Sequence, residues 1–414
     1  MILEFGPFNI IAVGDSFKGG EYLVGSKISA KIFAKLIHYT SKEDNNIFYS
    51  VSDFPPGCLK THIKLFIPGP TEVREDVLKE MTKPQIGHRT KEMSELYERI
   101  HNNLQKYFDT KNEVMVFTAS GTGMMEGSIR NTIQSDVLHL TNGSFSERWF
   151  EVSKANGKNA DSIKYEWGVA PKAVDLEERL AGKRYEGIAL THNETSTGVR
   201  TPIEDFYKIA HERNSLFLVD AVSSLAGDTI DVNKTDVIFA SSQKAFGLPP
   251  GLVITFISPE AMEKTMTVKG RGYYFDFISM KEDYDARKQI PATPAIPLFY
   301  SLDYQLERML QEGRENRFRR HKEMAEMVQK WGRENFSLFA EPGYESVTLT
   351  VVNNTRNLNI ENVRKLLRSK GMEISNGYGK LKEKTFRIAH MGDLTPVEVG
   401  ELLNAMDEII GLKQ

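Results

Sequence analysis

From Ile63 onward, short β-branched or apolar runs alternate with longer amphipathic segments along the chain. This alternation is typical of βαβ units, in which parallel strands are connected by helices that cover the sheet. The runs that predict strands are Val114–Thr118, Ala189–Thr191, Leu216–Asp220, Val237–Ala240 and Leu252–Ile257. The sequence therefore predicts an α/β fold with a largely parallel sheet.

Helical spacing of apolar residues marks several segments between and after these runs. Glu92–Phe108 and Pro202–Arg213 predict helices beside the sheet, and Tyr300–Asn335 predicts one long, charge-rich helix. The remaining predicted elements are strands over Val347–Val352 and Thr385–Ala389 and helices over Ile360–Lys370 and Pro396–Leu412. This last part of the chain predicts a compact α+β domain.

The length of the chain also bears on its organisation, because 414 residues exceed what one ordinary core holds. We expect a large domain over residues 63–312 and a small C-terminal domain over residues 313–414, with the boundary in the long helix near Gly313. Residues 1–62 show no clear apolar period, and we expect an N-terminal extension or arm there.

The charge and the cysteine content of the chain limit the kinds of partner and metal site that it is expected to have. Lys and Arg number 53 and Asp and Glu 56, which gives a formal net charge of −3. No stretch concentrates basic residues, so we expect a small-molecule partner and neither nucleic acid nor an anionic membrane. The single cysteine, Cys58, excludes internal disulfides and any all-cysteine metal site. The nine histidines form no ligand pair, so no metal site is expected.

Neither a membrane helix nor a secretion signal is recognisable. The longest apolar stretches, such as Gly251–Ile257, are far shorter than the roughly 18 residues that a membrane helix needs. The N-terminus has no basic lead-in and no small-residue cleavage site. We therefore expect a cytoplasmic protein, which the single cysteine also suits.

A glycine-containing turn follows the strand Val114–Thr118 and opens a helix. Ser120, Gly121 and Thr122 lie at this turn, where free backbone N–H groups and the positive end of a helix dipole could hold a phosphate. Taken alone, such a turn is more often a plain connection between strand and helix. No Gly-Lys-Ser/Thr of a Walker loop follows it.

An acid and a lysine come later in the chain. Asp220 ends the strand Leu216–Asp220 at the edge where doubly wound sheets bind ligands, although an aspartate there is commonly a turn former. Lys244 lies among small, polar and apolar residues, where a depressed pKa would make it a nucleophile or base. Pyridoxal 5′-phosphate (PLP) needs an anion site, a carboxylate for its pyridine nitrogen and an amine for a Schiff base. Together the three features predict a PLP enzyme.

Further motifs follow one another over residues 64–414: Phe66–Thr71, Gly87-His88-Arg89, Ala119–Thr122, Asn193–Val199, Leu218–Ser224, Ser242–Ala245 and Pro249–Gly251. With these motifs the chain resembles the class V aminotransferases, which have PLP-transferase fold type I, and within them the serine–pyruvate or alanine–glyoxylate type. The resemblance implies a large domain with a mostly parallel seven-stranded sheet flanked by helices, and a smaller C-terminal α+β domain.

Roles at the cofactor follow from the resemblance, position by position. Ser120, Gly121 and Thr122 match the turn that binds the phosphate. Lys244 matches the lysine that forms the internal aldimine, and Asp220 matches the partner of the pyridine nitrogen.

Other matched positions surround the ring. Gln243 matches a residue that helps to hold the cofactor, and Thr195 matches a side chain near the ring oxygen. Phe145 takes the place of an aromatic residue, often tryptophan, that stacks on the ring. Arg387 matches the arginine that holds the substrate's α-carboxylate, which its forked guanidinium suits.

The resemblance also implies a homodimer with shared active sites. Gln289 and Thr293 match a loop that reaches the phosphate in the partner subunit, although the family often has tyrosine with a neighbouring threonine there. Gly69 and His88 lie in motifs that line the substrate side of the site. A lone histidine is more often structural, so His88 has a structural interpretation as well as one in which it contacts the ligand.

The implied reaction is a ping-pong transamination through the internal aldimine on Lys244, with serine or alanine as donor and pyruvate or glyoxylate as acceptor. A single matched arginine, Arg387, favours donors without a side-chain acid, although Arg89 or Arg271 could fold inward. The alternatives are a 2-aminoethylphosphonate aminotransferase, another small-substrate aminotransferase of class V, and a non-catalytic PLP-binding protein. A cysteine desulfurase is disfavoured, because Cys58 precedes every motif.

Overall fold

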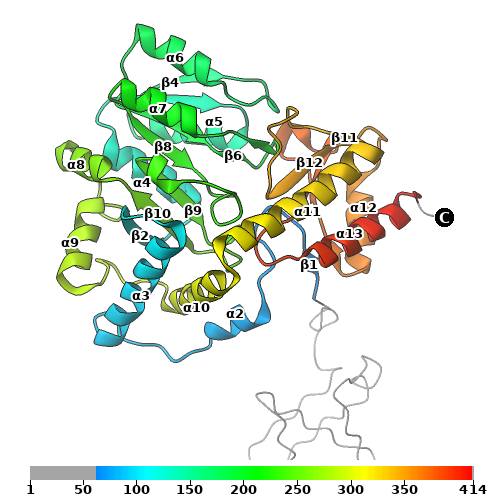
Figure 1. Ribbon diagram of the computed structural model, residues 1–414, viewed down its shortest axis with the longest axis horizontal. Coiled ribbons are helices and arrows are strands. Elements are labelled where there is room, and N and C mark those ends of the chain that lie inside the picture. The colour runs from blue at the N-terminus through cyan, green and yellow to red at the C-terminus, as the bar shows by residue number, and fades with distance from the viewer. Residues whose placement is uncertain (1–61, 413–414) are drawn as a thin grey trace, which may run out of the picture. The chain divides into compact units, whose positions relative to one another are not determined.

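The computed structural model describes residues 62–412 of the chain. The N-terminal arm expected over residues 1–62 therefore lies outside this range, His62 apart, as does Cys58. From Ile63 onward the described chain forms one compact unit (Figure 1). No helix within residues 62–412 combines the length and the apolar character that crossing a bilayer requires.

A seven-stranded sheet dominates the structure (Figure 1). Its strands lie side by side in the order β2 (Glu113–Thr118), β10 (Leu252–Ile257), β9 (Val237–Ser241), β8 (Leu216–Asp220), β5 (Gly187–Thr191), β3 (Asp136–Thr141) and β4 (Asn159–Lys164). β10 is antiparallel to both of its neighbours, and the other neighbouring pairs are parallel. The predicted α/β fold with a mostly parallel sheet is confirmed.

Burial explains which strands the sequence predicts. Every residue of β9 and of β10 is buried, as expected for central strands covered on both faces, and such strands appear as continuous apolar runs. β4 lies at the edge of the sheet and has no buried residue, so its sequence carries no apolar run. β3 is also absent from the predicted strands; its apolar residues are interrupted by His139.

Within residues 62–412, nine helices belong to the part of the structure around this sheet, and four of them, α4 to α7, lie between its strands along the chain. They are α2 (Glu75–Glu80), α3 (Lys91–Phe108), α4 (Gly121–Thr132), α5 (Ser144–Ala155), α6 (Ala173–Gly182), α7 (Glu204–Glu212), α8 (Pro259–Thr267), α9 (Phe277–Arg287) and α10 (Ile296–Glu312). α3 contacts β2, α4 contacts β8 and β9, and α5 contacts β3 and β4. α3 buries Met93, Leu96, Tyr97 and Ile100, which confirms the helical spacing read from the sequence.

The prediction of one continuous helix over Tyr300–Asn335 is wrong in one respect. The structure has two helices there, α10 and α11 (Arg314–Asn335), with Gly313 between them. Gly313 adopts φ +81° and ψ 137°, a conformation that glycine tolerates and a helix does not contain. Figure 1 shows α11 running beside β11, β12 and α13. The division into two domains near Gly313 stays a prediction.

A second, four-stranded antiparallel sheet follows α11. Its order is β11 (Ser337–Leu338), β12 (Leu349–Asn353), β15 (Thr385–Ala389) and β14 (Ser375–Asn376). It shares an apolar core with α11, α12 (Ile360–Ser369) and α13 (Pro396–Ile409). Thr395 and Glu398 form a capping box that begins α13. Short pairs complete the fold: β1 (Lys64–Leu65) with β13 (Met372–Glu373), and β6 (Asn193–Glu194) with β7 (Val199–Arg200).

Candidate active site

A cavity of about 210 Å³ lies where several parallel strands end. Asp220 ends β8, Ser241 ends β9, Asn193 comes shortly after β5, and Ser120 follows β2. The full lining is Ser120, Gly121, Thr122, Met125, Phe145, Arg148, Asn193, Thr195, Asp220, Val222, Ser223, Ser241, Gln243 and Lys244. The carboxyl edge of a parallel sheet is where doubly wound folds bind ligands.

The turn before α4 presents free backbone N–H groups to this cavity. Ser120 is the N-cap residue, with extended φ and ψ, and its side chain does not cap the helix. The N–H groups of Gly121 and Thr122 have no acceptor within residues 62–412. A Cβ on Gly121 would lie 2.6 Å from Cγ2 of Val222, so only glycine fits there. The turn therefore combines free donors with the positive end of a helix dipole, as an anion site requires.

Asp220 is a buried acid on the cavity wall, with 3% of its surface exposed. One carboxylate oxygen accepts the Val222 N–H at 2.8 Å. Burial raises the pKa of Asp220 to about 7, against the lowering effect of that hydrogen bond and of the Lys244 and Arg148 charges. A cation placed opposite this carboxylate would lower its pKa again and keep it ionised.

Lys244 supplies the amine. It lies in the connection between β9 and β10, and its Nζ donates a hydrogen bond to the Pro68 carbonyl at 2.5 Å. Burial lowers the pKa of Lys244 to about 8, and the nearby charges of Arg387 and Arg148 act in the same direction while Asp220 opposes them. With this pKa, about a tenth of the amine is in the neutral, reactive form at pH 7, far more than for an ordinary lysine.

Gly69 makes room for the lysine. Its φ is +136°, a region that side-chain-bearing residues rarely adopt, and a Cβ there would lie 2.8 Å from Cε of Lys244. The lysine side chain therefore passes directly over the glycine backbone. Gly69 borders the amine, as its predicted place beside the substrate requires, although its role toward a substrate stays a prediction.

Phe145, Arg148 and Tyr378 form one side of the site. The Phe145 ring lies 5.4 Å from the Tyr378 ring and 4.9 Å from the Arg148 guanidinium, measured to the ring centroid. Arg148 donates to the Tyr378 hydroxyl at 3.1 Å and to the Thr122 hydroxyl at 3.4 Å. An aromatic face and a cation therefore share this wall, and the stacking role of Phe145 stays a prediction.

Glu194 sets the position of this wall from behind. It is completely buried, and its carboxylate accepts the backbone N–H groups of Phe145 and Ser146 at 3.1 and 2.9 Å. The hydroxyls of Ser146 and Ser196 donate to it as well. These contacts hold the first turn of α5, and with it the Phe145 ring, against β6.

Polar atoms without partners also line the cavity. Asn193 Oδ1, Ser241 Oγ and Gln243 Oε1 are buried, and none has a hydrogen-bond partner within residues 62–412. Buried polar atoms are normally paired, so such a cluster indicates that a polar ligand completes the site. Beside them, the Thr195 hydroxyl donates to Ser223 Oγ at 2.8 Å, which fixes its direction.

Arg387 approaches from the second sheet. It lies on β15, its Nε donates to the Asn376 carbonyl at 3.0 Å, and its guanidinium lies 5.3 Å from the centroid of the Tyr378 ring. Burial lowers the pKa of Arg387 to about 10, although Tyr378 and Glu194 raise it. In the described part of the chain, neither Arg387 nor Arg148 pairs with a carboxylate. Two guanidinium groups near one cavity are thus available to anions.

Gln289, Thr293 and His88 do not line the cavity of this chain. The Gln289 side chain is buried and donates to Ser94 Oγ at 2.9 Å, while Thr293 is exposed. Arg89 donates to the carbonyls of Ile290 and Pro291, at 2.6 and 2.5 Å, and so holds the segment between Gln289 and Thr293. Whether these residues act toward a partner subunit stays a prediction.

Two residues of the site escaped sequence reasoning. Arg148 lies three residues after Phe145 and so shares its face of α5, a spacing from which it could have been predicted. Tyr378 comes from the segment after β14, and nothing in the sequence predicts its contact with α5. Arg89 and Arg271, which the sequence offered as a second arginine for the substrate, have other partners. Arg89 donates to the Ile290 and Pro291 carbonyls. Arg271 donates to the Val268 carbonyl and pairs with Asp276.

The titration of Lys244 tests the electrostatics of the cavity in the chain freed of small molecules. With a pKa of about 8, half of the amine is neutral at pH 8, against about 0.4% for an ordinary lysine of pKa about 10.4. Asp220→Asn is expected to lower the pKa further, because the carboxylate favours the ammonium form, and Arg387→Met to raise it. The measurement is pH-dependent acylation of Lys244 read by mass spectrometry, with exposed Lys330 as reagent reference. A Lys244 titration that neither substitution moves would contradict this account.

Comparison with known proteins places the chain in a family. The class-V aminotransferase family matches residues 65–381. An uncharacterized aminotransferase of Methanocaldococcus jannaschii is 37% identical over 79% of this chain and 87% of its own length. The L-aspartate–glyoxylate aminotransferase of Paracoccus denitrificans is 33% identical over 80% and 87%. The crystal structure of an alanine–glyoxylate aminotransferase from Nostoc sp. superposes with a TM-score of 0.81 at 28% identity, covering 88% of this chain and 99% of its own. The chain therefore belongs to the class-V aminotransferase family, as its motifs predict.

Proposed function

We propose that this protein uses PLP to move the amino group of a small L-amino acid, serine or alanine, to a 2-oxo acid, glyoxylate or pyruvate. One observation carries the proposal: free N–H groups at a helix terminus, a buried carboxylate and an amine of lowered pKa meet in one cavity. Relatives that act on glyoxylate support the acceptor.

The residues of the cavity fit PLP. Ser120, Gly121 and Thr122 would hold the phosphate, Asp220 would face the pyridine nitrogen, and Lys244 would bind the aldehyde carbon. The unpaired atoms of Asn193, Ser241 and Gln243 offer contacts to a polar ligand of this kind. When bound, PLP supplies an aldehyde that captures amines and a protonated ring that withdraws electrons from the substrate's Cα.

The chain's own residues would then perform the proton transfers. Lys244 Nζ, with a pKa of about 8, is suited to accept the Cα proton and to return it, because it populates both protonation states near neutral pH. With PLP bound, the Asp220 carboxylate would stay ionised and would favour the protonated form of the pyridine nitrogen. Arg387 orients the substrate by binding its α-carboxylate, and Phe145 keeps water from one side of the site.

Replacement of the lysine tests the reaction. Lys244→Ala is expected to lower kcat for alanine with glyoxylate by about 10²–10⁴-fold, the contribution of one acid–base group. Lys330→Ala, a change on the exposed face of α11, serves as the matched control. The readout is glycine and pyruvate formed over time, with melting curves to show that both variants fold. Wild-type turnover by Lys244→Ala would refute the mechanism, and bound PLP without turnover in the wild type would favour the non-catalytic alternative.

Arg148 favours a second candidate, an acidic donor such as aspartate or 2-aminoethylphosphonate. Its guanidinium lines the cavity and contacts only hydroxyls and the Phe145 ring within residues 62–412. The side-chain carboxylate of aspartate or the phosphonate of 2-aminoethylphosphonate could pair with this guanidinium. With aspartate, Arg387 would hold the α-carboxylate. The L-aspartate–glyoxylate aminotransferase among the relatives supports the same candidate.

A donor panel separates the two candidates. If Arg148 binds a side-chain anion, Arg148→Met lowers kcat/KM for aspartate and 2-aminoethylphosphonate by about 10–100-fold, the worth of one charged hydrogen bond, and leaves alanine and serine nearly unchanged. Arg387→Met is the comparison, because it removes the contact common to every donor with an α-carboxylate. Equal losses for all donors in Arg148→Met would exclude an anion-selective role for Arg148.

A homodimer with shared active sites completes the proposal. Thr293 is exposed on a segment that Arg89 holds in place, so it is available to another subunit. Sedimentation equilibrium is expected to give twice the chain mass of 46.9 kDa. Mixing Lys244→Ala with Thr293→Ala chains is expected to restore activity, because one site of the mixed dimer then contains both native residues. A monomeric mass, or no restoration in a confirmed mixed dimer, would contradict the sharing.

A further inference from the structure

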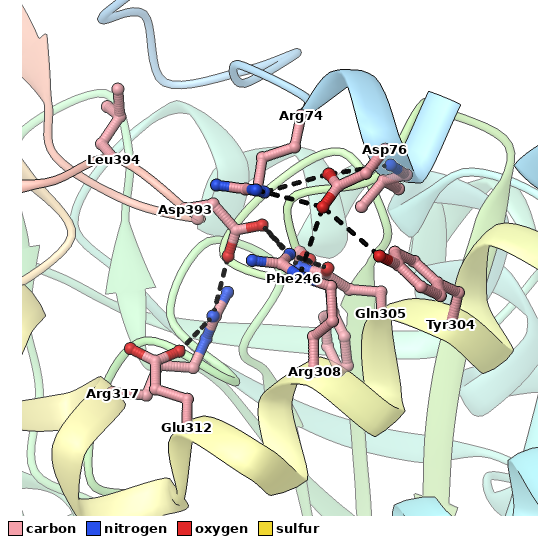
Figure 2. A network of polar contacts seen from close by, with 12 residues as sticks. Arg74, Asp76, Phe246, Tyr304, Gln305, Arg308, Glu312, Arg317, Asp393 and Leu394 are labelled. Carbon is pink, nitrogen blue, oxygen red and sulfur yellow. Dashed lines mark hydrogen bonds and ion pairs between the residues drawn. The ribbon is translucent and has the colours of Figure 1, made fainter. Parts of the chain in front are cut away.

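The connection that carries Lys244 is held by buried side chains from α10 and α11. It is a turn outside any helix or strand, so its carbonyls lack ladder partners. The Ala245 carbonyl accepts from Arg317 Nη2 at 2.7 Å, and the Phe246 carbonyl accepts from Gln305 Nε2 at 2.7 Å. The two carbonyls that directly follow Lys244 are therefore fixed by two side chains. Figure 2 shows Phe246 and Gln305.

One carboxylate, that of Asp393, orients both donors. It accepts from Arg317 Nη1 at 3.0 Å through one oxygen, and through the other from Gln305 Nε2 at 3.1 Å and Arg308 Nη1 at 2.7 Å. The Asp393 and Arg317 side chains are only 8% and 1% exposed, so water screens the pair little. Although burial alone would raise the pKa of Asp393, the charges of Arg317 and Arg308 hold it well below its ordinary value. Asp393 is thus a permanent charge.

Asp393 also belongs to the segment that follows β15, the strand of Arg387. The carbonyls on either side of it, from Gly392 and Leu394, accept hydrogen bonds from Arg320 of α11 at 3.1 and 2.5 Å. The end of β15 and the Lys244 connection are therefore bound to the same helix, through the same buried cluster. Figure 2 shows Asp393 between α10, α11 and the connection that contains Phe246.

We propose that Asp393, acting through Arg317 and Gln305, is a positioning residue that sets the separation between the Lys244 amine and the Arg387 guanidinium. The proposal rests on the proposed function, in which these two groups bind the two ends of one substrate. A misplacement of about 1 Å at a reacting group can cost about 10²-fold in rate, so the buried cluster would govern catalysis without contact with the substrate.

Asp393→Asn tests this, because it keeps the size of the side chain and removes its charge. Asp236→Asn is the matched control. Asp236 is 1% exposed and accepts from the Phe217 N–H at 2.7 Å and from Ser258 Oγ at 2.8 Å, so it is an equally buried and bonded aspartate. It precedes the start of β9, at the end of the strand away from Lys244, and none of its partners bonds the Lys244 connection.

Two readouts are measured well below the melting temperature of each full-length variant: amide hydrogen exchange of peptides covering residues 242–250, and kcat/KM for alanine with glyoxylate. Asp393→Asn is expected to speed exchange in this peptide at least about tenfold and to lower kcat/KM about 10–100-fold. Asp236→Asn is expected to change neither the exchange of residues 242–250 nor kcat/KM. An Asp393→Asn protein that melts earlier but keeps wild-type exchange and kcat/KM would overturn the proposal.

Gln305→Met provides an answer even if Asp393→Asn fails to fold. It leaves the pair of Asp393 with Arg317 intact and removes the donor to the Phe246 carbonyl. We expect faster exchange of residues 242–250 and a lower kcat/KM, both by smaller factors than in Asp393→Asn. A folded Gln305→Met protein with both readouts unchanged would refute the positioning role. Hydrogen exchange can be measured without turnover, so the two proposals can fail separately. If the wild type lacks transaminase activity, the proposed function is rejected. If the variants still exchange faster over residues 242–250, the link between Asp393 and the Lys244 connection remains supported.

Discussion

The direction of one strand, β10, determines where the reactive groups of this protein lie. β2, β5, β8 and β9 run the same way, so the residues that follow them meet at a single edge. A further parallel strand after β9 would need a long crossover, usually through a helix. Because β10 instead runs antiparallel beside β9, the chain turns back at once, and Lys244 lies in that turn above the edge that already holds Asp220.

Burial then adjusts the chemistry of the two groups in opposite senses. Loss of water raises the pKa of Asp220 to about 7 and lowers that of Lys244 to about 8, because each group is less easily charged there. Both therefore change protonation close to neutral pH. The guanidinium groups of Arg148 and Arg387 make the surroundings locally positive although the chain has a net charge of −3. Anionic ligands are thus attracted by the site and not by the surface as a whole.

Sequence reasoning predicts what depends on local pattern. β8, β10 and β15 begin and end where the apolar runs do, because such runs are signatures of buried strands. The predicted cofactor residues of one chain that meet in the cavity are Ser120, Gly121, Thr122, Phe145, Thr195, Asp220, Gln243 and Lys244. What depends on packing between distant segments escapes prediction, and Tyr378 against Phe145 and Asp393 beneath the Lys244 connection are the examples. Neither pair has a spacing or composition that marks it.

The buried Glu194 has a consequence for the orientation of any ligand. Two helix N-termini border the cavity, those of α4 and α5, and each would by itself attract a negative group. At α5 the Glu194 carboxylate already occupies the first-turn N–H groups, whereas at α4 they stay open. The protein has supplied one of the two anions itself. A ligand with its negative charge at one end is therefore favoured in a single orientation, with that end at the N-terminus of α4. The protein determines this orientation without any contribution from the ligand.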